Sequence, residues 1–185
     1  MERKLVHSRE VRCLGYLRDD GLWDIEGQLT DRKTYLHDDG HAARREPGDP
    51  VHDLSLRMTI DDRYEIREIV PVFTNVPHPD CRGAASAYEG LVGVPIVAGF
   101  SRTVRERTGG VKGCTHLTDL LTAMATTAFQ TVFGWTHLRT GSGNGLGSAA
   151  SVAAVINGCR TWRSDGEIVS RICPERFTGP ADGPA

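Results

Sequence analysis

The sequence predicts an α+β fold, in which an antiparallel sheet of two or three hairpins packs against one long helix and one shorter helix. In the N-terminal half, alternating apolar and polar residues flank two acidic turn signals, which is typical of hairpins. In the second half, apolar residues recur at helical spacing after a glycine-rich loop. A chain of 185 residues suits one domain, which we place at 1–178, with a disordered tail over 179–185.

The first hairpin is predicted over residues 11–30, with its turn at Asp19-Asp20-Gly21. Apolar residues of its second strand share one face, and Asp24 and Glu26 lie on the other. Most such polar faces contact water. The alternative is that these two carboxylates line a pocket and divide the roles of general acid and general base.

The second hairpin is predicted from alternating apolar residues over 54–60, a turn at Asp61-Asp62 and a return strand over 64–73 rich in Ile and Val. A third hairpin is possible, with strands over 155–162 and 167–172 around a Ser-Asp-Gly turn.

Two helices are predicted between these hairpins. The shorter one covers about 84–91 and ends near two glycines, and the long one covers about 115–133 with one apolar stripe. The glycines at 141, 143, 145 and 147 follow a predicted helix and alternate with other residues, whereas a dinucleotide fingerprint follows a strand and reads G-x-G-x-x-G. A flexible linker is therefore favoured over a phosphate-binding loop.

Composition narrows the functional classes. A net charge of −2 gives no basic excess, so we expect no nucleic-acid partner. We see neither a secretory leader nor a membrane-spanning apolar run, so we expect a cytoplasmic protein without membrane association. Five irregularly spaced cysteines argue against a disulfide framework and leave metal binding, catalysis or core packing.

The strongest candidate for chemistry is the pair Cys114 and His116 at the start of the long helix. A helix N-terminus stabilises a thiolate, the form that binds metals or attacks electrophiles. The alternative is a capping cysteine beside a histidine in solvent. Cys81 and Asp53 also lie at predicted strand ends and can converge with this pair. Thiolates with an imidazole and a carboxylate suit zinc or iron.

Two resemblances add to this interpretation. The stretches Leu22–Gly27, Leu29–Asp31, Pro50–Asp53 and Gly113–Leu117 resemble a bacterial family known as domain of unknown function 2889, over about residues 12–134. That family brings no activity to carry over.

The order of strands, cysteine, helix and the run Val111–Cys114 is also similar to iron–sulfur scaffolds of the IscU/NifU type. The resemblance implies that Cys81, Cys114 and Asp53 match ligand positions of a zinc or cluster site. Val51-His52 stands where the scaffold has its first cysteine, and the scaffold's His-Cys pair is replaced by Cys114-Thr115.

Three functional hypotheses follow. The leading one is a small metalloenzyme of lyase or hydrolase type that acts on a small organic molecule. Cys81, Cys114 and either His116 or Asp53 would bind zinc or iron. Asp24 or Glu26 would act as general base. The second is a non-enzymatic metal or iron–sulfur scaffold. The third is a metal-free enzyme with Cys114 as nucleophile and His116 as its base. The sequence does not predict an oligomeric state.

Overall fold

The computed structural model describes residues 1–38, 40, 44–140 and 155–180, and the side chains of all of these except 136–140. The chain groups into two compact units, residues 1–131 and 132–185, which are described separately. The single domain expected over 1–178 therefore stays a prediction. The glycines at 141–147 and the tail from 181 lie outside the described residues.

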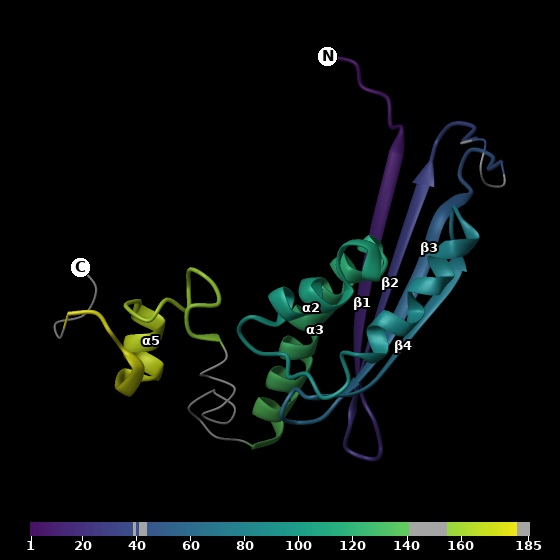
Figure 1. Cartoon of the computed structure of the whole chain (residues 1–185). Helices are drawn as coiled ribbons and strands as arrows, with labels where there is room; N and C mark the ends of the chain where they lie inside the picture. The colour runs from purple at the N-terminus through teal and green to yellow at the C-terminus, as the bar shows by residue number, and fades with distance from the viewer. Residues whose placement is uncertain (39, 41–43, 141–154, 181–185) are drawn as a thin grey trace. The chain divides into compact units, whose positions relative to one another are not determined.

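The first unit contains a four-stranded antiparallel sheet in the order β1-β2-β3-β4 (Figure 1). The strands are β1 (His7–Leu17), β2 (Trp23–Lys33), β3 (Pro50–Ile60) and β4 (Ile66–Asn75). They form the two predicted hairpins, and the predicted α+β class is confirmed. All the strands are longer than the usual five or six residues, so each hairpin presents two extended faces.

The turns form where the acidic residues predicted them, because short carboxylates accept backbone hydrogen bonds. Asp20 accepts from the N–H of Leu22 at 3.1 Å, and Gly21 provides the positive φ of +84° that this turn needs. In the second turn, Asp61 accepts from the N–H groups of Arg63 and Glu65, each at 2.9 Å.

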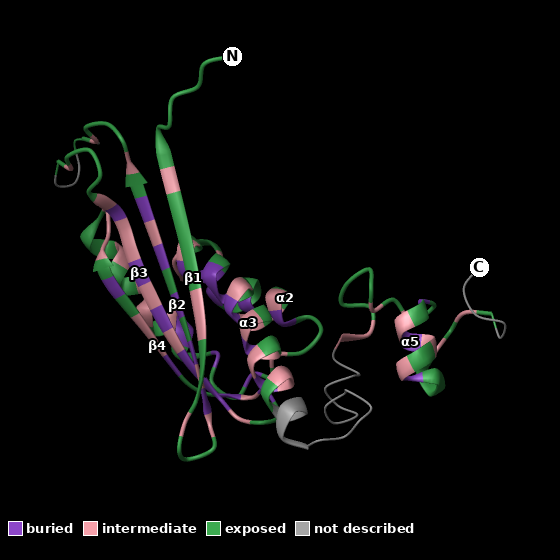
Figure 2. Cartoon of the chain, turned by 180° about the vertical axis from the view of Figure 1, so that it is seen from behind, coloured by how far each residue is buried: buried purple, intermediate pink, exposed green. Residues whose placement is uncertain are grey.

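The two faces of the sheet differ as the alternation requires. The inner face is buried under the helices (Figure 2). Its fully buried side chains include Ile25, Leu29, Leu54, Leu56 and Met58. Helix α3 (Thr115–Thr140) approaches closely at Gly27, where an added Cβ would lie 2.6 Å from the sulfur of Met124. This close approach fixes α3 against the centre of the sheet.

The connecting helices differ in detail from the prediction. The 84–91 helix is a 3-10 turn, η1 (Pro79–Ala85), that continues into the short α1 (Ser86–Glu89). Helix α2 (Phe100–Thr108) was not predicted, and it leads through η2 (Gly110–Lys112) into α3. Helix α3 extends to Thr140 rather than to about 133.

The second unit is small, and the third hairpin predicted there is wrong. Residues 167–172 form helix α5 (Glu167–Ile172), followed by η3 (Pro174–Arg176). Val169 and Cys173 are buried against Ile156, Trp162, Ile172 and Phe177. Within the described residues, no helix is both long enough and apolar enough to cross a membrane.

Candidate metal centre

The centre is built around Asp31, near the end of β2. This carboxylate points to the inner face, where its side chain is 3% exposed. The β2–β3 register shifts directly after it, and such irregularities commonly re-aim side chains beside functional sites. Arg9 on β1 donates to both of its oxygens, at 2.8 and 2.9 Å, and Nε2 of His7 lies 3.2 Å away. The carboxylate is therefore held rigidly from the β1 side.

Two imidazoles approach Asp31 from other elements. His52 pairs with Asp31 across the β2–β3 ladder, and its Nδ1 lies 3.2 Å from Oδ2. His116, in the first turn of α3, places Nε2 3.5 Å from the same oxygen. The ring centroids of His52 and His116 are 3.8 Å apart. Three elements distant in sequence thus direct one potential ligand atom each to a common point.

The protonation states favour metal coordination. Burial and the neighbouring His116 ring lower the pKa of His52 to about 4. Burial, followed by Arg9, lowers the pKa of His116. Burial raises the pKa of Asp31, but Arg9 and the imidazoles outweigh it, and the resulting pKa lies below its ordinary value. Near neutral pH, both rings are uncharged and the carboxyl is ionised, which are the forms that bind metals.

The spacing also fits an ion. The ligand atoms of Asp31, His52 and His116 all lie within 4.8 Å of one another. In a tetrahedral zinc site with bonds of about 2.0 Å, ligand atoms lie about 3.3 Å apart, close to the 3.2 and 3.5 Å measured from Asp31. Nδ1 of His52 is buried, and within the described part of the chain it makes no hydrogen bond. A bound cation would satisfy this atom.

A cavity of about 500 Å³ adjoins the centre. His52 and His116 line it, as do Cys81 and Cys114. Its wall also contains aliphatic side chains, such as Leu54 and Val76. An ion held by the two histidines would therefore be reachable from a partly apolar cavity of the size that binds small organic molecules.

Buried polar contacts fix the segment that enters α3. The hydroxyl of Tyr88, from α1, donates to the carbonyl of Cys114 at 2.8 Å and accepts from its N–H at 3.0 Å. Thr118 bonds back to the carbonyl of Thr108 at 3.1 Å. Within this segment, Sγ of Cys114 lies 3.8 Å from Nδ1 of His116. This is the ring nitrogen that faces away from Asp31. The predicted Cys114–His116 pair is thus in contact.

The remaining predicted residues fall on both sides of the sheet. Cys81 lines the same cavity as Cys114 but is not part of the three-residue group. Asp53 neighbours His52 in sequence, so its side chain points to the opposite face, where it accepts from Gln28 at 3.0 Å. The structure therefore does not bring Asp53 to the centre.

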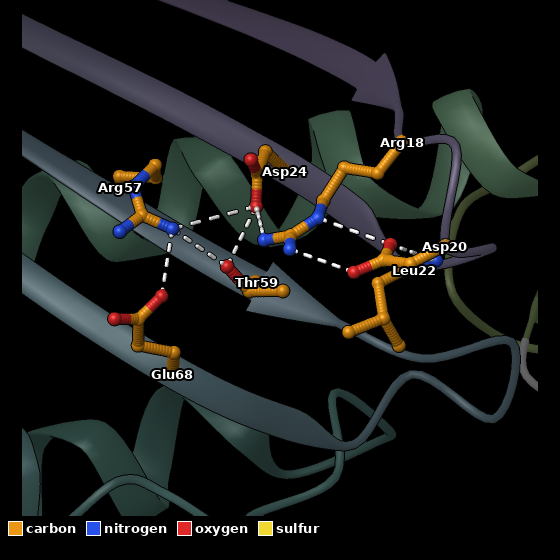
Figure 3. A network of polar contacts seen from close by, with 7 residues as sticks. All are labelled: Arg18, Asp20, Leu22, Asp24, Arg57, Thr59 and Glu68. Atoms are coloured by element: carbon orange, nitrogen blue, oxygen red, sulfur yellow. Dashed lines mark hydrogen bonds and ion pairs between the residues drawn. The ribbon is translucent and has the colours of Figure 1, made fainter.

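Asp24 and Glu26 also lie on that opposite face. Figure 3 shows Asp24 directed toward Thr59 and Arg57 of β3, with Arg18 closing the group from the hairpin turn. Its carboxylate accepts from Thr59 at 2.6 Å and lies 3.5 and 3.6 Å from Arg18 and Arg57. These contacts give Asp24 a role in stabilising the sheet. Glu26 lines a separate open cavity of about 490 Å³ on this outer face, and neither carboxylate lies beside the cavity at the centre.

The comparisons with known proteins add a family. The model of a family described as protein of unknown function DUF2889 matches residues 7–130. The chain belongs to the DUF2889 family. The DUF2889 match includes all the strands and every residue of the centre, and it leaves residues 131–185 outside. No curated protein and no solved structure matches the chain. The resemblance to IscU/NifU-type scaffolds thus receives no support.

Asp31 and His52 were not predicted as ligands, although the sequence holds a signal for them. Both occupy the apolar phase of an alternating strand, two residues from Leu29 and Leu54 respectively. A polar residue in the buried phase needs a partner and often marks a site. The DUF2889 chain pairs these two residues across its central strands.

Proposed function

We propose that this chain is a metal-dependent enzyme that holds zinc or iron through Asp31, His52 and His116 and acts on a small organic molecule in the adjoining cavity. The observation that carries the proposal is the convergence of three ligand atoms within 4.8 Å, one of them a buried imidazole nitrogen without a hydrogen bond. Two histidines and one carboxylate are a donor set used by catalytic zinc and by non-haem iron.

The surrounding residues support a catalytic rather than a structural ion. A structural zinc has four protein ligands, whereas three leave a position for water or substrate. Such an ion supplies Lewis acidity or an activated water. Arg9 and His7 orient Asp31, as outer-shell groups do in metal sites. Cys114 contacts the second nitrogen of His116 and can fix the orientation of that ring.

Elemental analysis of tag-free protein tests the proposal. Because the proposed centre holds a single ion, we expect about one zinc or iron per chain. We expect this metal to be lost in His52→Ala and in His116→Ala. Asp53→Asn is the matched control, because Asp53 is adjacent to His52 but faces the other side of the sheet. Metal content that is equal in the wild type and both histidine variants would exclude this centre.

Cys81→Ala and Cys114→Ala decide whether sulfur takes part. We expect both variants to keep the metal, because neither cysteine belongs to the three-residue group. Loss of metal in either one would bring a thiolate into the coordination sphere, as the sequence predicted.

A second candidate is a metal-free enzyme with Cys114 as nucleophile, and one observation favours it. Cys114, His116 and Asp31 form a chain with contacts of 3.8 and 3.5 Å. This is the order of nucleophile, base and orienting carboxylate found in hydrolytic triads. In this state His116 would accept the thiol proton at Nδ1 and donate its Nε2 proton to Asp31.

Selective alkylation distinguishes the two candidates. In the presence of a chelator, a triad makes Cys114 react with iodoacetamide faster than the exposed Cys159, and His116→Gln slows the reaction of Cys114. Cys114 reacting no faster than Cys159 would remove this candidate and leave the metal centre alone.

A further inference from the structure

Strand β1 is an exposed edge of unusual length. It has 11 residues, pairs with β2 without a register shift, and within the described residues no strand covers its other side (Figure 1). The opposite edge of the sheet is covered near both ends, since Ile66 at the start of β4 exchanges hydrogen bonds with Gly93 and Val94, and Arg82 donates to the carbonyls of Phe73 and Thr74. Proteins often protect free edges with proline, a bulge, a short strand or charged side chains. Strand β1 has none of the first three, and its exposed charges at Glu10 and Arg12 are of opposite sign.

We propose that a second copy of this chain pairs with β1 in antiparallel fashion about a two-fold axis through Val11, so that two four-stranded sheets become one. This inference does not depend on the proposed function. Three features favour a second copy as the partner. They are the direction of the free backbone groups, the charges beside Val11 and the apolar residues at both ends of the strand.

The hydrogen-bond parity of β1 supports an axis at Val11. Arg18 donates to Leu22 and Thr34 donates to Val6, so even-numbered residues direct their backbone groups toward β2. Odd-numbered residues of β1 therefore direct N–H and C=O outward. Val11 and Cys13 are the two central outward-facing residues of β1, and two copies of Val11 can exchange both hydrogen bonds across a two-fold axis.

The charges beside Val11 are self-complementary. In this register Glu10 of each copy lies opposite Arg12 of the other, as a non-hydrogen-bonded pair whose side chains lie closest together. Both residues are exposed, and neither forms an ion pair within the described part of one chain. Centring the axis on Arg9 instead would oppose two guanidinium groups, and centring it on Cys13 would leave Glu10 opposite Tyr16.

The same register joins the exposed apolar residues. Val11 meets its own copy on the inner face, Val6 meets Tyr16 on the outer face, and Leu5 meets Leu17. These side chains, on β1 and the two residues before it, are between 41% and 66% exposed in the single chain. Pairing would bury them in both copies at once.

Paired charge variants test the register. Light scattering across a dilution series should give a dimer for the wild type, whereas Glu10→Arg and Arg12→Glu should each weaken dimerisation roughly tenfold or more, because each creates two like-charge pairs. An equal mixture of the two variants should restore a dimer, since every cross-strand pair is then opposite in charge. Failure of the mixture to associate more tightly than either variant alone would overturn the register.

Val11→Pro tests the backbone contribution separately. Proline removes an N–H that points outward, so the β1–β2 ladder keeps its hydrogen bonds while the proposed dimer loses two. Val11→Thr keeps the N–H and is the matched control. We expect a monomer for Val11→Pro and a dimer for Val11→Thr, with unchanged circular dichroism in both. A wild type that stays monomeric, or a dimer insensitive to Val11→Pro, would overturn the proposal.

Discussion

Tyr88→Phe should loosen the candidate centre, although Tyr88 contacts no ligand. Tyr88 is fully buried, and its hydroxyl bonds both the carbonyl and the N–H of Cys114. That peptide immediately precedes α3, and His116 follows it by two residues. Phenylalanine keeps the ring and removes only the oxygen, so any change reports on these hydrogen bonds.

The expected loss of stability follows from the backbone groups that Tyr88→Phe leaves without partners. The Cys114 carbonyl still accepts from the N–H of Thr118 at 2.9 Å, so its loss is partial. The Cys114 N–H has no second partner among the contacts of the described residues. Leaving one such group unsatisfied costs about 1–3 kcal/mol of unfolding free energy. Because outer-shell groups position metal ligands, affinity for the metal should also fall about 10–100-fold.

Two measurements check this prediction. Urea unfolding in a chelator gives the stability change, and competition with a chromophoric chelator gives the change in zinc dissociation constant. Tyr35→Phe is the control, because Tyr35 is 45% exposed and lies outside this contact network. A Tyr88→Phe variant that matches the wild type in both measurements would refute the idea that this hydroxyl organises the start of α3.

Three further predictions concern the core and the centre. In the metal-free protein, His52 is protonated near pH 6.5 in the unfolded chain but only near pH 4 in the native chain. The free energy of unfolding should therefore fall by about 2 kcal/mol from pH 7 to pH 5. Urea unfolding of His52→Gln over the same pH range should lack this part of the decrease. Cys114→Ser should bind zinc within about threefold of the wild type by competition titration, because a serine hydroxyl can still accept the Nδ1 proton of His116 that the sulfur now faces. Gly27→Ala should destabilise by about 1–3 kcal/mol in thermal unfolding, since its Cβ would lie 2.6 Å from Met124, whereas Gly83→Ala, with open space, should not.

The sheet and the long helix could be predicted because their patterns are local. Trp23, Ile25 and Leu29 alternate with polar residues, and the structure buries them as the strand period requires. The prediction of a strand over 167–172 was wrong because the segment is short. Its apolar residues Ile168, Val169 and Ile172 fit a returning strand or a short helix equally well. Its helix is fixed by packing of Val169 and Cys173, which is tertiary information.

The centre could be predicted only in part. The proximity of Cys114 and His116 follows from their positions two residues apart at a helix start, which is local. The meeting of Asp31 with His52 requires the β2–β3 register, and their approach to His116 requires the placement of α3 on the sheet. Asp53 was predicted as a ligand because it lies at a predicted strand end and matches a ligand position of the scaffold resemblance, but strand alternation sends neighbouring side chains to opposite faces.

The two candidate chemistries compete for one nitrogen of His116. An ion bound at Nε2 requires its lone pair and leaves the ring proton on Nδ1, facing the sulfur of Cys114. The triad requires the reverse, with a proton on Nε2 directed at Asp31 and a lone pair facing the thiol. Both states cannot coexist in one molecule. Metal occupancy should therefore suppress alkylation of Cys114, and removal of the metal should restore it only if the triad forms.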